Sequence, residues 1–115
     1  MRFSLLFAFL IFLDAFSAEA NSEISRELLR SKETGKKIEF YWSKPDGVGP
    51  FPVLLLIHPE QESPKIGGKL FVESGQLDYW REKGFTTIAI SQPGYGESEG
   101  PPDFCGPKTQ SAVVE

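Results

Sequence analysis

The stretch VLLLIHP, residues 53–59, decides the fold class. Its five apolar residues, Val53 to Ile57, are bounded by Pro52 on one side and by His58 and Pro59 on the other. A short apolar run without alternation is typical of a strand that is buried on both faces, and such strands are usually parallel and central in their sheet. The sequence therefore predicts an α/β protein organised around this strand.

The residues before this strand predict an antiparallel hairpin. Residues 37–43 alternate strictly, with an apolar set (Ile38, Phe40, Trp42) and a set expected to face solvent (Glu39, Tyr41, Ser43). Residues 33–35 would form the turn before this strand. Residues 21–31 fit either a short helix or an edge strand, since Ile24 and Leu28 are four residues apart but also alternate with polar residues; we favour the strand.

The residues after the apolar strand predict a helix, a second strand and a third segment that begins a helix. Residues 70–83 have helical composition, with Ser74 as a possible cap and Lys83 followed by Gly84 as a stop signal. Residues 85–91 are rich in Thr and Ile and predict a strand. Residues 92–106 are a loop rich in Gly and Pro, and Pro107 is expected at the first position of a helix over residues 108–115.

This order of elements resembles the N-terminal portion of the α/β-hydrolase family. The resemblance rests on two antiparallel strands, a buried strand that ends in His58, a helix, and a strand that runs into QPGYGES, residues 92–98. The segment DFCGP, residues 103–107, is similar to the prolyl-oligopeptidase-like and dienelactone-hydrolase-like branches. The resemblance to the family implies an antiparallel hairpin followed by parallel strands with a crossover helix, in a sheet that is incomplete without later strands. Residues 53–57 would then form an exposed apolar edge, which soluble proteins avoid.

The same resemblance implies that the loop after residues 53–57 donates one backbone N–H to an oxyanion hole. Pro59 has no N–H and departs from the glycine that many members carry after this histidine. The donor would therefore be Glu60 or, as a second choice, Gln61. The alternative is that both are ordinary loop residues.

Two glycine motifs imitate functional sites without the required context. GESEG, residues 96–100, matches the G-x-S-x-G elbow of serine hydrolases, but Pro101 and Pro102 prevent the helix that must follow an elbow. No histidine follows Ser98, although the triad order of the family is serine, acid, histidine. The glycines of residues 94–100 do not have the spacing of a dinucleotide fingerprint either.

One cysteine and one histidine exclude an internal disulfide and the common metal sites. His58, near Glu60 and Glu62, is better interpreted as a residue that ends a buried strand than as a metal ligand. Cys105 has no visible base to make it a nucleophile, and any disulfide partner would lie outside this chain. We therefore expect neither a metal nor a cofactor.

The first 20 residues have the layout of a signal peptide. Met1 and Arg2 precede an apolar run over residues 3–13, and Ala18 and Ala20 fit a cleavage site. The run is shorter than the roughly 20 residues that a membrane span needs. We therefore expect cleavage after Ala20, a secreted or periplasmic protein without a stable membrane span, and residues 21–115 as the N-terminal part of the hydrolase domain. The net charge of −4, from 12 Lys and Arg against 16 Asp and Glu, does not favour nucleic-acid binding.

Two functions are compatible with the sequence. The first is the N-terminal segment of an exported serine hydrolase acting on a small-molecule ester or peptide, in which the nucleophile, acid and histidine would follow Glu115 and no catalytic residue lies in this segment. Its partner would be the remainder of its own hydrolase domain. The second is a non-catalytic secreted fragment or module that pairs through its exposed strand edge. A close variant of this second function is a longer pseudo-enzyme that lacks the triad.

Overall fold

A computed structural model describes residues 23–115, in which four strands form one mixed sheet. The strands are β1 (Ser25–Arg30), β2 (Lys37–Ser43), β3 (Val53–Ile57) and β4 (Thr86–Ile90), and their order across the sheet is β1-β2-β4-β3. β2 pairs antiparallel with both β1 and β4, whereas β3 pairs parallel with β4. The predicted antiparallel hairpin and parallel strand pair are therefore confirmed, and residues 21–31 contain a strand rather than a helix.

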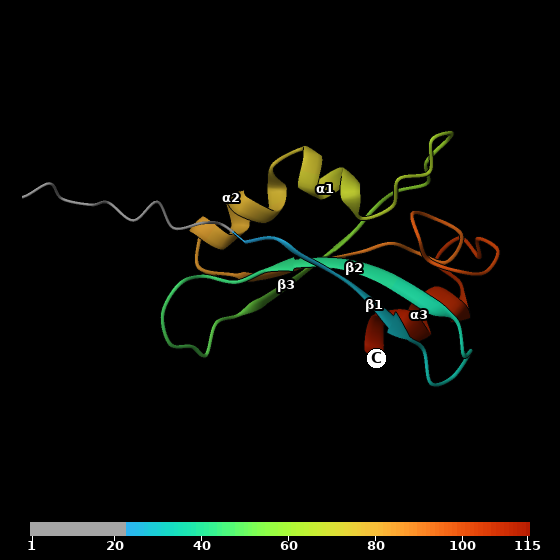
Figure 1. Cartoon of the computed structure of the whole chain (residues 1–115), viewed down its shortest axis with the longest axis horizontal. Helices are drawn as coiled ribbons and strands as arrows, with labels where there is room; N and C mark the ends of the chain where they lie inside the picture. Colours follow the sequence, from blue (N-terminus) through green and yellow to red (C-terminus); the bar gives the residue numbers. More distant parts are fainter. Residues whose placement is uncertain (1–22) are drawn as a thin grey trace, which may run out of the picture.

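Within residues 23–115, three helices cover the two faces of this sheet. The connection between β3 and β4 contains α1 (Lys69–Glu73) and α2 (Gln76–Glu82), and α3 (Pro107–Val114) follows β4. In Figure 1, α1 and α2 lie on one face of the sheet and α3 lies on the other. The structure thus has an α/β-type arrangement with helices on both sides of the sheet.

The prediction of a single helix over residues 70–83 is wrong, because two helices, α1 and α2, occupy this segment. The segment is divided at Gly75, whose φ of +76° is left-handed and cannot continue a helix. Ser74 occupies the C-cap of α1. The predicted stop after Lys83 is confirmed, because Gly84 has a φ of +95°.

The face of β2 that was expected to meet solvent is the more deeply buried one, so that prediction is wrong. Glu39 is 2% exposed, Tyr41 8% and Ser43 0%. Tyr41 belongs to the main hydrophobic cluster, together with Phe71 of α1 and Leu77 of α2. The reason is topological: the crossover helices between the parallel strands lie over this face, and alternation along one strand does not show which face they cover.

The opposite face carries an apolar groove between the sheet and α3. The groove has a volume of about 230 Å³ and is lined by Leu29, Ile38, Phe40, Leu55, Ile88, Ile90, Ala112, Val113 and Glu115. α3 is tied to the β1–β2 turn, because the Glu115 carboxylate accepts hydrogen bonds from the Ser31 hydroxyl at 3.0 Å and from the Lys32 backbone N–H at 3.1 Å.

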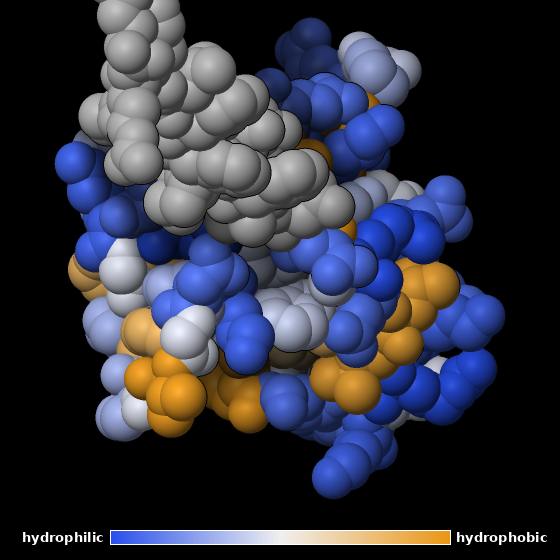
Figure 2. All heavy atoms as spheres, turned by 60° about the vertical axis from the view of Figure 1, so that its left-hand side comes forward, coloured by the Kyte–Doolittle hydropathy of each residue, from blue (hydrophilic) through white to orange (hydrophobic). Residues whose placement is uncertain are grey.

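β3 forms one edge of the described sheet, so the prediction of a central strand buried on both faces is wrong for residues 23–115. The apolar run alone does not show whether a neighbouring strand lies on each side. Val53 is 63% exposed and Ile57 43%, so the strand is only half-buried. Other large hydrophobic side chains are also exposed, and Figure 2 shows hydrophobic residues as separate patches among hydrophilic ones on the side it presents.

No helix within residues 23–115 combines the length and hydrophobicity needed to cross a membrane. The predicted signal peptide and its cleavage after Ala20 lie outside the described residues.

Candidate functional site

The candidate site lies where the two parallel strands end. His58 follows β3 and Ser91 follows β4, and the loops that begin there, residues 58–68 and 91–106, extend beyond the same end of the sheet (Figure 1). In open α/β sheets, ligands bind in the crevice outside the carboxyl ends of the strands. Both loops also carry buried polar side chains, which require specific partners.

Both ring nitrogens of His58 are hydrogen-bonded, Nε2 to the other loop and Nδ1 within its own loop. It is 1% exposed, and its Nε2 accepts a hydrogen bond from the backbone N–H of Gln92 at 3.0 Å. Nδ1 therefore carries the proton and donates to the Pro59 carbonyl at 2.8 Å. Burial lowers the pKa of His58, which favours this neutral form. Both nitrogens are thus occupied, which supports a structural role and argues against metal binding.

A cavity of about 210 Å³ lies beside this histidine. It is lined by His58, Pro59, Glu60, Gln92, Tyr95, Phe104 and Cys105. Phe104 and Cys105 are the two non-glycine residues of the described chain with positive φ, at +49° and +62°, and Phe104 is 73% exposed. Backbone strain of this kind is concentrated at functional sites. The Cys105 thiol donates to the side-chain carbonyl of Gln92 at 3.3 Å, so it connects the two ends of the loop of residues 91–106.

The two residues expected to donate to an oxyanion hole have different surroundings. Glu60 lines the cavity, whereas the Gln61 side chain closes its own loop by accepting from the Gly67 N–H at 2.7 Å and donating to the Gly67 carbonyl at 3.1 Å. Within residues 23–115, neither backbone N–H of this pair donates a hydrogen bond. Both therefore remain available as donors, and Glu60 is the one that borders the cavity.

Beneath these loops lies a buried ionic network that the sequence did not predict. The Oε2 atom of Glu39 accepts from the Arg26 Nε at 2.7 Å and lies 2.6 Å from the Arg26 Nη2. The other oxygen, Oε1, accepts from the Ser91 hydroxyl at 2.8 Å and from the Glu97 backbone N–H at 3.3 Å. The hydrogen bond to Glu39 raises the pKa of Arg26 further above its usual value. The sequence offered one signal for this network, the charged Glu39 between Ile38 and Phe40 in a predicted strand. The residues that bind its carboxylate are distant in sequence, so they could not be identified from it.

Ser98, the serine of the G-x-S-x-G match, belongs to the same network. Its side chain is 7% exposed, donates to the Ser91 carbonyl at 2.6 Å and accepts from the Glu39 backbone N–H at 2.8 Å. A hydroxyl held between two backbone groups is not presented to a substrate. This geometry argues against Ser98 as a nucleophile.

Glycines allow the loops to lie directly on this network. A Cβ atom on Gly67 would lie 2.3 Å from the Ser91 Oγ, and one on Gly96 would lie 2.3 Å from the Glu39 Oε1. A Cβ on Gly68 would lie 2.7 Å from the Ala89 carbonyl oxygen. Gly96, one of the glycines that imitate a dinucleotide fingerprint, is therefore explained by close packing between loop and sheet.

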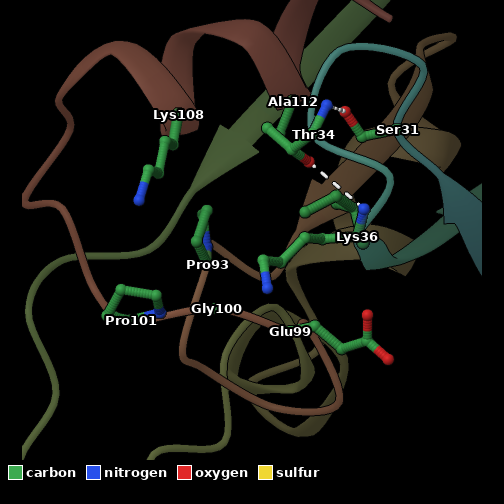
Figure 3. A pocket seen from close by; sticks show the side chains of 10 residues that line it. Ser31, Thr34, Lys36, Pro93, Glu99, Gly100, Pro101, Lys108 and Ala112 are labelled. Atoms are coloured by element: carbon green, nitrogen blue, oxygen red, sulfur yellow. Dashed lines mark hydrogen bonds between the residues drawn. The ribbon is translucent and has the colours of Figure 1, made fainter.

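A second cavity, between the β1–β2 turn, the loop of residues 93–101 and α3, is too small for a substrate. Lys36, Glu99 and Lys108 are among the residues around it (Figure 3). Its volume of about 30 Å³ holds little more than a water molecule. The cavity beside His58 is therefore the better candidate site.

Within residues 23–115, no group of three or more His, Cys, Asp or Glu side chains is placed to hold a metal ion. Comparison of the chain with protein-family models, with curated proteins and with solved structures finds no match. The four-stranded mixed sheet and the geometry of its two loops are therefore the observations from which a function must be argued.

Proposed function

We propose that this chain is the N-terminal segment of an exported serine hydrolase that acts by acyl transfer on an ester or amide. In this proposal the segment supplies the loop of the oxyanion hole and half of the sheet, and the nucleophile, acid and histidine follow Glu115. The observation that carries the proposal is the loop after β3, which has free backbone N–H groups at a cavity outside the carboxyl ends of two parallel strands.

The order of the strands supports the proposal. In the α/β-hydrolase fold the third strand lies between the fourth and the fifth, and the fifth leads into the nucleophile elbow. Here β4 lies beside β3, and the other side of β3 is unpaired within the described residues. An apolar edge of this kind is a site for pairing with a further strand. A fifth strand at this edge would place the elbow next to the loop of residues 58–68.

The local chemistry favours Glu60 as the oxyanion donor. An oxyanion hole needs N–H groups about 2.7 to 3.1 Å from the developing negative charge, held without reorganisation. Pro59 has no N–H, and Gln61, unlike Glu60, does not line the cavity beside His58. His58 and Gln92 hold the beginning of the loop through two hydrogen bonds. The adjoining cavity, with Pro59, Tyr95 and Phe104, suits a small apolar acyl group or side chain.

The exposed edge of β3 favours one other function, a secreted module that binds a partner by strand addition. The unpaired edge carries Val53 and Ile57, which are 63% and 43% exposed. Backbone pairing along such an edge gives affinity, and side-chain pockets give selectivity. This alternative requires no catalytic residues.

The first experiment isolates the native protein with an antibody against residues 23–115 and combines its intact mass with labelling by a fluorophosphonate. The hydrolase proposal expects a mass well above the 12.8 kDa of the 115 residues and a labelled serine outside them. Labelling of Ser98 would contradict the placement of the nucleophile. A native protein that the probe does not label would favour the strand-pairing module.

A second experiment tests the oxyanion donor in the active native protein. Glu60→Pro removes the backbone N–H, whereas Glu60→Ala keeps it and serves as the matched control. We expect Glu60→Pro to lower kcat by about 10²- to 10³-fold, as for other oxyanion donors, and Glu60→Ala to have little effect. A similar loss with Gln61→Pro, and none with Glu60→Pro, would assign the donor to Gln61 instead.

A further inference from the structure

We propose that Glu39 is a positioning residue for the loop that presents the Glu60 N–H, and that it acts through Ser91. This inference rests on the proposed hydrolase function and adds to it a residue on β2, well separated in sequence from both loops. Glu39 does not line the cavity beside His58; its effect would be transmitted through hydrogen bonds.

The connection consists of two consecutive hydrogen bonds. The Ser91 hydroxyl donates to the Glu39 carboxylate at 2.8 Å and accepts from the Gly68 backbone N–H at 2.8 Å. Because the carboxylate offers only acceptors, it fixes the direction of the hydroxyl proton and leaves a lone pair for Gly68. The end of the loop of residues 58–68 is thereby held to the buried carboxylate.

The loop is held at three places, and Glu60 lies between them. The beginning is held by His58 and Gln92, the middle by the Gln61 side chain on Gly67, and the end by Ser91 on Gly68. A loop that must present an N–H to a transition state needs such support, because small misplacements reduce the rate strongly.

Arg26 keeps the carboxylate in position. A carboxylate that is 2% exposed needs a charged partner, and Arg26 provides two contacts of 2.7 and 2.6 Å to the same oxygen. The Arg26 side chain is 43% exposed, so the ion pair bridges the buried network and solvent. Both carboxylate oxygens are thus occupied by donors, and the orientation of the group is defined.

Glu39→Gln therefore removes the negative charge and one acceptor oxygen while the size of the side chain stays nearly the same. In either orientation, the amide NH₂ group of the new side chain would face a donor, on one side the Arg26 guanidinium and on the other Ser91 and Glu97. Ser91→Ala removes a single hydroxyl from the same path and does not disturb the ion pair. The exposed ion pair of Lys69 and Glu73 offers the matched control, Glu73→Gln.

The test measures hydrolysis of 4-nitrophenyl acetate by the native protein and its variants, well below their unfolding temperatures. We expect Glu39→Gln and Ser91→Ala each to lower kcat by about 10- to 100-fold with little change in KM, and the double variant to lose no more than either single one. The rate of phosphonylation by a fluorophosphonate should fall in parallel, since it depends on the same oxyanion donors. Glu73→Gln should leave all three quantities unchanged.

The outcomes separate this inference from the proposed function. A wild-type protein without ester hydrolysis or labelling would refute both. An active wild type that is impaired by Glu60→Pro, but not by Ser91→Ala, would refute the positioning role alone. If Glu39→Gln fails to fold, the kcat of Ser91→Ala decides the question by itself.

Discussion

Three glycines of the β3–β4 connection and the β1–β2 turn allow the close packing of loop and sheet to be measured by single substitutions to alanine. Gly35 has a φ of +68° and open space around its Cβ position, so Gly35→Ala introduces only backbone strain. Gly68 has an ordinary φ of −63°, but its Cβ would lie 2.7 Å from a backbone carbonyl of β4, so Gly68→Ala introduces only steric overlap. Gly67→Ala combines a φ of +65° with a Cβ 2.3 Å from the Ser91 Oγ.

The expected losses of stability follow from these geometries. A left-handed alanine costs about 1 to 2 kcal/mol, and the reduced entropy of the unfolded chain returns about 0.4 to 1 kcal/mol. Gly35→Ala should therefore lower the free energy of unfolding by about 1 kcal/mol. Overlap in a close-packed region costs about 1 to 3 kcal/mol, and the same entropy effect offsets part of it, so Gly68→Ala should lose about 1 to 2 kcal/mol. Gly67→Ala should lose about 2 to 4 kcal/mol, because both costs apply and the Ser91 hydroxyl must give up its bonds.

The assay is urea unfolding of the native protein, followed by the fluorescence of Trp42 and Trp80. We expect the urea concentration at the midpoint of unfolding to be highest for Gly35→Ala, lower for Gly68→Ala and lowest for Gly67→Ala. Equal losses for Gly67→Ala and Gly35→Ala would show that the loop does not rest on Ser91, and the argument from close packing would be wrong.

Three other substitutions test the remaining features. Burial lowers the pKa of His58, so the unfolded state binds a proton at a higher pH than the folded state does. The free energy of unfolding is therefore highest above pH 6.5 and falls below it, by at most about 1.4 kcal/mol per pH unit. His58→Gln should remove this pH dependence between pH 7.5 and 5.5. Asp103→Ala should lower the free energy of unfolding by about 1 kcal/mol and speed hydrogen exchange at the start of α3, because the Asp103 carboxylate accepts from the Lys108 N–H at 2.7 Å. Glu62→Ala, at an exposed position, is the control and should change neither quantity. Ser98→Ala should lower the free energy of unfolding by about 1 to 3 kcal/mol, because two buried hydrogen bonds are lost, and fluorophosphonate should still label the variant. Loss of the label in a folded variant would instead identify Ser98 as the nucleophile.

The strands were predictable because their signals are local. The apolar run of residues 53–57 and the Thr- and Ile-rich residues 86–90 correspond to β3 and β4, and the alternation of residues 37–43 corresponds to β2. Gly84 marked the end of α2 because it follows helical residues directly. Gly75 has the same left-handed conformation, but its neighbours have helical composition on both sides, so the break between α1 and α2 was not predictable from them.

The polar network was not predictable because it depends on which face the crossover helices cover. Glu39 alternates with apolar residues, which is equally consistent with exposure and with burial. Its partners, Arg26, Ser91 and Glu97, lie 13 to 58 residues away in sequence. Only the pairing of β2 with both β1 and β4 brings them together.

The placement of this network bears on its purpose. A buried ion pair contributes little net stability compared with apolar residues of the same volume, because removing both charges from water is costly. At the other end of the same sheet face, Tyr41, Phe71 and Leu77 form the apolar cluster that such a face normally carries. The buried charge of this face, the Glu39 carboxylate, lies at the end from which the two loops leave, where directional hydrogen bonds fix positions that apolar contacts would leave free. The cost of burying Glu39 is therefore best explained by the need to hold the loop of residues 58–68 in one conformation.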